Sequence, residues 1–341
     1  MGSKKVTMIV DLQYGSTGKG SIAGYLARRE EADVVVSANM PNAGHTFIDE
    51  QGRKFVNKVL PSAAASPFVK AVLIGPGAVF DPKQLKKEIQ EHRKAGYLVG
   101  VPIFIHENAV PLMEEHRQIE QESDELKNIG STQQGSMAAM VYKLARDPSK
   151  RVIARDVDMG LDLWHMIEVI TPRAYQGVLQ EANHILAEGA QGFSLGINER
   201  FYPYCTSRDC TVARFLAEMA IPHWMLDDVI GTLRTYPIRV GGNSGGCYPD
   251  QREMTWDEVG VEPETTTVTG RVRRVFDFSI IQFREALHMN RPNHLFLNFV
   301  NYLKNEEIDD FIPMVDIIAH EFNSRLSFLG YGPTINDIAE V

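Results

Sequence analysis

The segment from Gln13 to Ser21 combines residue types that bind phosphate groups. It follows the apolar run Val6–Val10 and carries, in order, Gln13, Tyr14, Gly15, Ser16, Thr17, Gly18, Lys19, Gly20 and Ser21. The glycines allow a tight turn whose backbone N–H groups point at an anion, and Lys19 adds a full positive charge. A Walker A loop would need glycine at position 13 and Ser or Thr at position 20. The spacing therefore predicts a phosphate-binding turn of another kind, and a purely structural tight turn is the alternative.

A second polar segment, residues 39–46, follows the next apolar run of the chain. The residues in it that could bind a ligand or take part in catalysis are Asn42, Gly44, His45 and Thr46. In open α/β sheets, ligands bind where adjacent parallel strands end, and a glycine beside a histidine permits close backbone approach. His45 is therefore a candidate catalytic residue. The alternative is a histidine that only satisfies buried polar groups.

Alternating apolar runs and helical patterns must hold these two segments in place. The best-marked helix is Pro82–Ala95, because Asp81 can cap it and Pro82 suits its first turn. The alternation predicts an α/β fold with a mostly parallel, doubly wound central sheet. Strands are predicted at Val6–Val10, Val34–Ser37, Ala71–Ile74, Val101–Ile105, Ile185–Ala187, Val229–Tyr236 and His294–Phe299, and further helices at Ser21–Glu30 and Phe276–Asn290.

The middle of the chain, at about 110–180, is predicted to form a helical excursion from this sheet. It contains two segments with helical patterns, Pro111–Lys127 and Ser131–Arg146. We find no repeat, low-complexity tract or linker in the sequence, so we expect residues 1–341 to form a single domain.

Composition limits the classes of function. Net charge is −9, which disfavours a broad nucleic-acid-binding face. The three cysteines form no CxxC pair, which indicates a reducing compartment and no zinc site. No apolar run approaches the roughly 20 residues needed to span a bilayer. We therefore expect a soluble, cytoplasmic protein that acts on small molecules and not at a membrane.

Six segments, taken in order, resemble motifs of the adenylosuccinate synthetase family. The family motifs are QWGDEGKGK, NAGHT, GTTGRG, EGAQG, YPYVTS and TTGRxRR. The matching residues here are 13–21, 42–46, 130–135, 188–192, 202–207 and 268–274. Their shared order and intervals make the resemblance specific and extend it over most of the chain. The resemblance implies an adenylosuccinate synthetase-like fold, related to that of P-loop proteins, and a ligase that forms a C–N bond.

The family reaction has two steps. A nucleoside triphosphate phosphorylates the purine 6-oxygen, and the aspartate amine then displaces that phosphate. By resemblance, Lys19 and the amides of residues 15–21 would hold the triphosphate, with Gln13 and Thr46 nearby. His45 would donate to the 6-oxygen, and Gln191 would lie near the 6-position. Mg²⁺ would bridge the phosphates and contact Gly44, with Ser16 at the family's metal-binding position.

The resemblance also implies sites for the other two substrates. The purine monophosphate would contact Asn42, Ser131, Thr132, Arg146, Gln191, Cys205, Thr206 and Arg271. Among these, Arg146 matches an arginine that the partner subunit contributes, which implies a homodimer. Aspartate would be bound by the loop residues Val268, Thr269, Gly270, Arg271 and Arg273, with Arg271 as the expected carboxylate clamp. The alternative for these arginines is a solvated basic surface.

Ser16 is the first departure from the family pattern, which has an aspartate there that takes the purine N1 proton and binds Mg²⁺. A group that contacts N1 lies close to C2, so a short hydroxyl leaves room for a 2-amino group and can accept its hydrogen bond. The substitution favours GMP or dGMP over IMP. It resembles the PurZ branch known from phages, which converts dGMP to N6-succino-2-amino-2′-deoxyadenylate on the way to diaminopurine DNA. Water on Mg²⁺, a substrate phosphate or Ser16 itself could replace the missing base.

The second departure lies at the expected base site of the triphosphate. The family ends a strand with TKLD, whose aspartate selects GTP, whereas this chain has Asn298-Phe299-Val300-Asn301. An amide can pair with the adenine edge and Phe299 can pack on a base, which favours ATP or dATP. The second wall of the pocket would be formed by Gly330, Gly332 and Pro333.

The leading hypothesis is therefore an ATP-dependent ligase that joins L-aspartate to dGMP. An ordinary synthetase that uses IMP is the alternative within the family. From a different class, the chain could be an inactive purine-nucleotide sensor, although intact Lys19, His45 and Arg271 argue against that.

Overall fold

A ten-stranded sheet runs through the computed structural model, which describes residues 5–266 and 270–341. Its strand order is β17-β16-β15-β11-β1-β10-β2-β5-β7-β9, and every neighbouring pair is parallel except β16 with β17. The strands are β1 Lys5–Asp11, β2 Val34–Ser37, β5 Ala71–Ile74, β7 Ile103–His106, β9 Glu168–Ile170, β10 His184–Glu188, β11 Leu226–Arg234, β15 His294–Asn298, β16 Arg325–Gly330 and β17 Ile338–Glu340. The predicted parallel, doubly wound sheet is confirmed.

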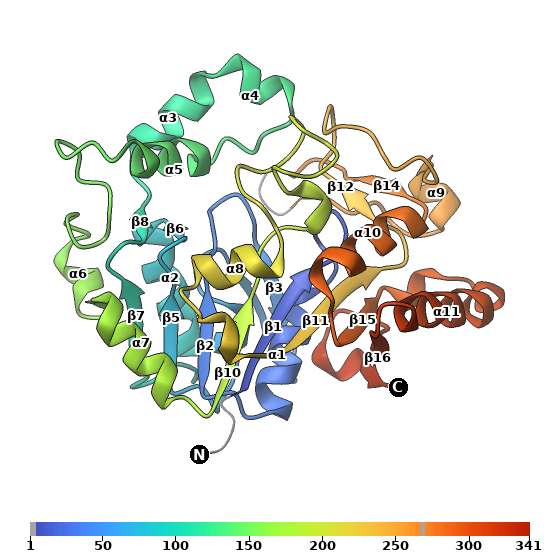
Figure 1. Cartoon of the computed structure of the whole chain (residues 1–341), viewed down its shortest axis with the longest axis horizontal. Coiled ribbons are helices and arrows are strands. Elements are labelled where there is room, and N and C mark those ends of the chain that lie inside the picture. The colour runs from blue at the N-terminus through green and yellow to red at the C-terminus, as the bar shows by residue number, and fades with distance from the viewer. Residues whose placement is uncertain (1–4, 267–269) are drawn as a thin grey trace.

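The strand order creates a switch point at the centre of the sheet. From β1 the chain winds outward through β2, β5, β7 and β9, then inserts β10 between β1 and β2 and winds the other way through β11, β15 and β16. The carboxyl ends of these strands face upward in Figure 1. Such a point is where ligands bind in open α/β sheets, because loops on its two sides diverge and leave a crevice.

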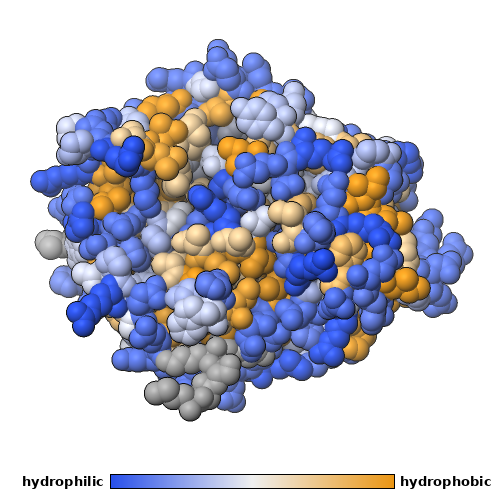
Figure 2. Space-filling view, in the orientation of Figure 1, coloured by the Kyte–Doolittle hydropathy of each residue, from blue (hydrophilic) through white to orange (hydrophobic). Residues whose placement is uncertain are grey.

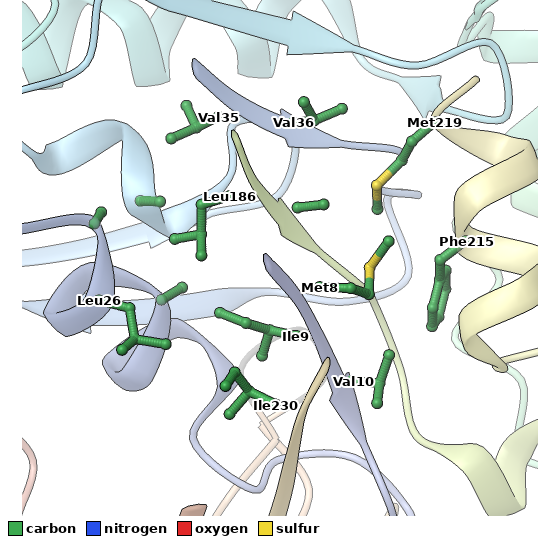
Figure 3. Close-up of a cluster of buried hydrophobic side chains, with 14 of the residues drawn as sticks. Met8, Ile9, Val10, Leu26, Val35, Val36, Leu186, Phe215, Met219 and Ile230 are labelled. Atoms are coloured by element: carbon green, nitrogen blue, oxygen red, sulfur yellow. The ribbon is translucent and has the colours of Figure 1, made fainter. Parts of the chain in front are cut away.

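The central strands are buried on both faces, which explains why they read as continuous apolar runs. All four residues of β2 and of β5 are buried, as are all five of β10. Figure 3 shows Ile9 and Leu26 on the side of α1 and Met8 beside Phe215 and Met219 on the other side. Apolar side chains thus fill the space on both faces of β1 and fix its position.

Helices cover both faces of the sheet and lie in the connections between its strands (Figure 1). Asp81 caps α2 as predicted, accepting hydrogen bonds from the N–H groups of Lys83 and Gln84. Ser279 caps α10, so that helix begins at Ile280 and not at Phe276 as predicted, because residues 274–276 pair in a strand. The covering helices are α1 Lys19–Arg29, α2 Pro82–Lys94, α7 Pro172–Glu181, α8 Val212–Glu218, α10 Ile280–Asn290 and α11 Asn305–His320.

The first helices of the middle region, within residues 114–145, stand above the carboxyl ends of the strands in Figure 1. The predicted helix Pro111–Lys127 is two helices, because the Ser123 side chain caps a new one by accepting from the Leu126 N–H group. The predicted helix Ser131–Arg146 begins only at Ser136, after a loop. The helices here are α3 Glu114–Glu122, α4 Asp124–Asn128, α5 Ser136–Ala145 and α6 Leu161–Trp164, and the range to residue 180 also includes β9 and most of α7. A single domain over 1–341 stays a prediction.

Small sheets and turns complete the described chain. A hairpin pairs β3 His45–Ile48 with β4 Lys54–Asn57, and a three-stranded antiparallel sheet has the order β12-β14-β13. The remaining elements are β6 Val79–Phe80, β8 Val110–Pro111, β12 Ile238–Arg239, β13 Glu253–Met254, β14 Arg274–Phe276 and α9 Trp256–Val259, with 3₁₀ turns at Ser62–Ala65, Phe193–Leu195, His223–Met225, Val300–Tyr302 and Ile335–Asp337.

The molecular surface is mixed in hydropathy on the face shown in Figure 2. Hydrophilic residues predominate there, and hydrophobic residues reach the surface in separate groups. Within residues 5–266 and 270–341, no helix has the length and apolar character that crossing a bilayer requires.

His92 on α2 gives the fold a testable dependence on pH. Its ring is buried, Nδ1 lies 2.8 Å from the Glu88 carbonyl oxygen, and burial lowers its pKa to about 4. In the unfolded chain the imidazole of His92 takes up a proton near pH 6.5, whereas in the folded chain it does so only near pH 4. The free energy of unfolding therefore decreases as the pH falls from about 6.5 to about 4. We expect His92→Gln to reduce the loss of unfolding free energy between pH 7.5 and pH 5 by about 2 kcal/mol. Urea unfolding of both proteins at both pH values measures this, and equal losses would contradict it.

Candidate active site

A cavity of about 620 Å³ opens where β1, β2, β10, β11 and β15 end. The loops that line it come from segments far apart in the sequence, brought together by the switch point of the sheet. The predicted residues among its lining are Gly15, Ser16, Gly18, Lys19, Gly20, Ser21, Asn42, Gly44, His45, Thr46, Thr132, Gln191, Arg273, Asn298, Asn301, Gly332 and Pro333. The glycine-rich segment 13–21 and the histidine segment 39–46 thus both contribute to this one cavity.

Asp11, at the end of β1, holds together the predicted phosphate-binding turn, residues 13–21, which we call the phosphate loop. Its Oδ1 accepts hydrogen bonds from the Gln13 and Gly15 N–H groups at 2.9 and 3.1 Å. Its Oδ2 accepts from the Thr17 hydroxyl and pairs with the Lys19 ammonium at 3.0 Å. The carboxylate is buried, so the loop is built around a charge that Lys19 neutralises. Gln13 and Thr17 are buried behind the cavity and have structural contacts there.

The phosphate loop also packs closely against the turn after β10. Lys19 Nζ donates to the Gln191 carbonyl oxygen at 2.9 Å. A Cβ on Gly192 would lie 2.2 Å from the Gly15 nitrogen and 2.5 Å from the Gln13 carbonyl oxygen. Only glycine fits at position 192, because both neighbouring atoms belong to the backbone. The two turns therefore form one rigid wall of the cavity.

His45 begins β3 and faces the cavity with one ring nitrogen unused. Nδ1 lies 2.7 Å from Glu188 Oε1, while Nε2 is buried and has no hydrogen-bond partner among the described residues. Glu188 is held by the Ser62 N–H group at 2.6 Å and by its hydroxyl at 3.2 Å. When both ring nitrogens carry protons, Nδ1 donates to the carboxylate and Nε2 can donate into the cavity. This pair can stabilise negative charge on an oxygen that binds beside His45.

Ser16 belongs to the same loop and lines the cavity. It adopts a left-handed backbone conformation with φ of 58° and its side chain is exposed in the cavity. Its carbonyl oxygen accepts from Arg234 Nη1 at 3.2 Å. The hydroxyl is therefore positioned by a fixed backbone and leaves space beside it.

At the base end of the cavity, Asn298 and Asn301 have different environments. Asn298 is buried, its Oδ1 accepts from the Phe299 N–H group and its Nδ2 donates to the Thr17 carbonyl oxygen. A Cβ on Gly330 would lie 2.2 Å from Asn298 Oδ1, so Gly330 packs behind this amide and does not line the cavity. Asn301 is exposed there, which makes its amide the one available to a base.

The buried Arg234 and the half-buried Glu264 form an ion pair at the same end of the cavity. Arg234, at the end of β11, lies 3.8 Å beneath the centroid of the Phe299 ring, and Nη2 pairs with Glu264 Oε1 at 2.5 Å. The Tyr302 hydroxyl donates to the same oxygen at 3.1 Å. Phe299 is thus held by a cation on one side, and its ring lines the cavity.

The structure separates the arginines of the expected aspartate loop. Arg273 lines the cavity, and burial lowers its pKa from the ordinary value although Glu264 opposes this shift. Arg271 and Gly270 are exposed and lie outside the lining, so the clamp role of Arg271 stays a prediction. Val268 and Thr269 lie outside the described residues.

Four other predicted residues also lie outside the lining. Ser131 and Cys205 are half-buried, and Thr206 accepts a hydrogen bond from Asn42 Nδ2 at 3.3 Å. Arg146 is exposed at the end of α5, in a left-handed conformation with φ of 53°. Its predicted contact would be made in a partner subunit, which this single chain does not contain.

Sequence reasoning missed four charged residues that support the lining from behind, and Glu264, which lines the cavity itself. Asp11, Glu188 and Arg234 stand at the ends of three neighbouring strands, and Arg208 and Glu264 lie in loops. A charged residue that ends an apolar run was the available signal at Asp11, Glu188 and Arg234. Their partners could not be read from the sequence, because Glu188 lies 143 residues from His45 and Arg234 lies 30 residues from Glu264.

The described residues could hold Mg²⁺ only with help from a ligand. No group of three or more His, Cys, Asp or Glu side chains there could hold a metal ion. Ser16 offers one hydroxyl and Gly44 one carbonyl, and both line the cavity. This set fits Mg²⁺, which commonly keeps several waters and binds through substrate phosphates.

The parallel sheet and the cavity at its switch point are typical of nucleotide-binding α/β proteins. The sequence model described as "Adenylosuccinate synthetase" matches residues 8–155 and 152–309, and the chain belongs to this family. It is 31% identical to an adenylosuccinate synthetase of Methanococcus vannielii, over 80% of this chain and 78% of that protein.

Within the family, phage proteins are more similar. The chain is 50% identical to "N6-succino-2-amino-2′-deoxyadenylate synthase" of Vibrio phage phiVC8, over 98% of both chains. Among solved structures, the cyanophage S-2L succinoaminodeoxyadenylate synthetase (PurZ), bound to dGMP and to dATP as energy donor, superposes with a TM-score of 0.90 at 36% identity, covering 99% of this chain and 95% of that one. The predicted resemblance to the phage branch is confirmed.

Proposed function

We propose that this chain is an ATP-dependent ligase that condenses L-aspartate with the 6-position of dGMP. The products are N6-succino-2-amino-2′-deoxyadenylate, ADP and phosphate, and a 6-phosphoryl nucleotide is the intermediate. The observation that carries the proposal is Ser16, exposed in the same cavity as His45 where the family has an aspartate. The similarity to phage synthases of this name, and to one that binds dGMP and dATP, supports it.

In the first step, the purine 6-oxygen attacks the terminal phosphorus of ATP, the bond from that phosphorus to ADP breaks, and N1 gives up its proton to water, a substrate phosphate or Ser16. His45 Nε2 would donate to that oxygen, with Glu188 stabilising the charged ring. Lys19 and the N–H groups of residues 15–21 would bind the phosphates, so Lys19 would exchange part of its contact with Asp11 for phosphate oxygens. Mg²⁺, held by those phosphates with Ser16 and Gly44, would supply further positive charge.

In the second step, the aspartate amine attacks C6 and the 6-phosphate leaves with the electrons of the C–O bond. Arg273 lines the cavity, and its guanidinium can bind a carboxylate in the bidentate geometry that Arg271 was predicted to provide. Arg271 is exposed outside the lining, so closure of this segment would be needed to bring it to the substrate beside Arg273.

The donor nucleotide would be ATP or dATP. Asn301 presents an exposed amide and Phe299 an aromatic face at the same end of the cavity. An amide matches the acceptor and donor of the adenine edge, whereas the family's aspartate matches guanine. Gly332 and Pro333 would form the opposite wall.

A homodimer in the cytoplasm would complete the active site. Val141 and Leu144 on α5 are 50% and 69% exposed, and Arg146 follows them directly. An exposed apolar helix face beside an arginine is consistent with a partner subunit that receives Arg146. Sedimentation of the protein with and without dGMP would test this assembly.

One assay tests the function. The protein is incubated with ATP, Mg²⁺, aspartate and either dGMP, GMP or IMP, and phosphate release is followed. Turnover with dGMP is expected, and turnover with IMP alone would contradict the 2-amino assignment. Nucleotide binding with no phosphate release in any combination would favour a sensor. Replacing ATP with dATP compares the two donors.

Ser16→Asp tests the specificity directly. A carboxylate at this position would fill the space beside C2 and clash with a 2-amino group that the hydroxyl can accommodate. We expect kcat/KM for dGMP to fall by about 10²-fold, since loss of a good hydrogen bond together with a clash costs roughly 3 kcal/mol. Ser16→Ala is the matched control and should lose only about tenfold. Equal use of dGMP by the Asp variant and the parent would refute the steric argument.

A further inference from the structure

Arg208 is a buried cation next to the cavity but not part of its lining. The residue is 2% exposed, and its Nη1 donates to the Ala38 carbonyl oxygen at 2.7 Å and to Glu218 Oε2 at 2.8 Å. Its Nε donates to Gln191 Oε1 at 2.9 Å. These contacts fix the guanidinium on both sides, so Arg208 is a rigid support for the Gln191 side chain.

Two amides and a hydroxyl continue from Arg208 as a chain of hydrogen bonds. Gln191 Nε2 donates to Asn42 Oδ1 at 2.7 Å, and Asn42 Nδ2 donates to Thr206 Oγ1 at 3.3 Å. Gln191 and Asn42 both line the cavity. Each member therefore has one end in this chain and can offer another to a ligand.

The direction of every bond in this chain follows from its first member. A guanidinium has donors and no acceptor, so Gln191 must present its oxygen to Arg208 and its NH₂ group to Asn42. Asn42 must then accept at its oxygen and donate from its NH₂ group to Thr206. The remaining N–H of each amide and the Thr206 hydroxyl proton are left as donors. With the amides reversed, oxygen lone pairs would occupy these positions.

We propose that Arg208 is a positioning residue that acts through Gln191 to orient the Asn42 end of this chain, so that this end presents donors to the phosphate of the purine monophosphate. An oxyanion accepts hydrogen bonds and is repelled by oxygen lone pairs, so the orientation decides whether this side of the cavity attracts or repels it. Arg208 acts through Gln191 and Asn42 without touching the nucleotide. The inference rests on the proposed function only for the identity of the ligand.

Arg208→Met tests this by comparing dGMP with deoxyguanosine, which lacks the phosphate, in calorimetric binding without turnover. We expect the dGMP Kd to rise about tenfold or more, and the deoxyguanosine and dATP Kd values to stay within about twofold of the parent. An equal loss for dGMP and deoxyguanosine would show a merely structural role and overturn the proposal. So would an unchanged dGMP Kd.

Conservative variants keep the test decisive if Arg208→Met does not fold. Lysine at position 208 is again a donor without an acceptor, whereas glutamine can present either end to Gln191. Arg208→Lys should therefore bind dGMP within about threefold of the parent and Arg208→Gln about tenfold more weakly, and the reverse order would overturn the proposal. Arg214→Met removes the other arginine on Glu218 and should leave dGMP binding unchanged.

Measurements of binding and turnover on the unmutated protein distinguish a failure of this inference from a failure of the proposed function. If it binds dGMP more tightly than deoxyguanosine but shows no turnover, the ligase function fails and the positioning role can still be measured. If the parent does not distinguish the two ligands, the positioning role fails whatever the turnover.

Discussion

His45→Ala is expected to lower kcat with dGMP by about 10²–10³-fold, the range found when a donor to a developing oxyanion is removed. The Nε2 atom is buried in the cavity wall without a partner among the described residues, so its hydrogen-bonding capacity is available to a substrate. Because the donor acts mainly on charge that appears in the transition state, KM for dGMP should change by less than about threefold. Steady-state phosphate release measures both constants.

Glu188→Gln is the graded companion of that variant. An amide can still hold the ring of His45 and accept from Ser62, but it carries no negative charge that would stabilise an imidazolium. We expect a loss in kcat of about tenfold, smaller than that of His45→Ala. If His45→Ala retained parental kcat, donation to the 6-oxygen would be wrong. If the His45→Ala variant also bound dATP more weakly than the parent, its lower kcat would reflect a damaged cavity.

Lys19→Met is expected to be both inactive and less stable. It removes the ammonium that should bind the transferring phosphoryl group, and kcat should fall by about 10³-fold or more. It also leaves the buried Asp11 carboxylate without its cation, since the two groups are 3.0 Å apart and the carboxylate is shielded from water. Breaking a buried ion pair in this way costs roughly 3–5 kcal/mol. Urea unfolding and phosphate release measure the two effects.

The double variant Asp11→Asn/Lys19→Met separates these two roles of Lys19. An asparagine at position 11 can still accept from the Gln13 and Gly15 N–H groups and no longer needs a cation. We expect it to recover much of the lost unfolding free energy and none of the lost kcat. Recovery of activity in the double variant would mean that Lys19 serves only to neutralise Asp11.

The sequence by itself determined the architecture and the main loops of the site. Apolar runs such as Val34–Ser37 and Ala71–Ile74 were predicted at their observed bounds, because strands buried on both faces must be continuously apolar. Asp81 was predicted as a helix cap for a local reason, namely that its side chain bonds to N–H groups within three residues. The glycine-rich turn and the histidine segment were found because the residues that carry their chemistry lie next to one another in the sequence.

The tertiary structure decided which side chains support that chemistry. Asp11 holds Lys19, Glu188 holds His45, and Arg208 orients Gln191, but only the first pair lies within one short segment. Glu188 and His45 are 143 residues apart, and they meet because β10 inserts between β1 and β2. Hydrogen bonds between such distant segments depend on strand order, and neither composition nor periodicity carries that information. The sequence therefore determined the groups that face the substrate, and the fold decided which charges hold them there.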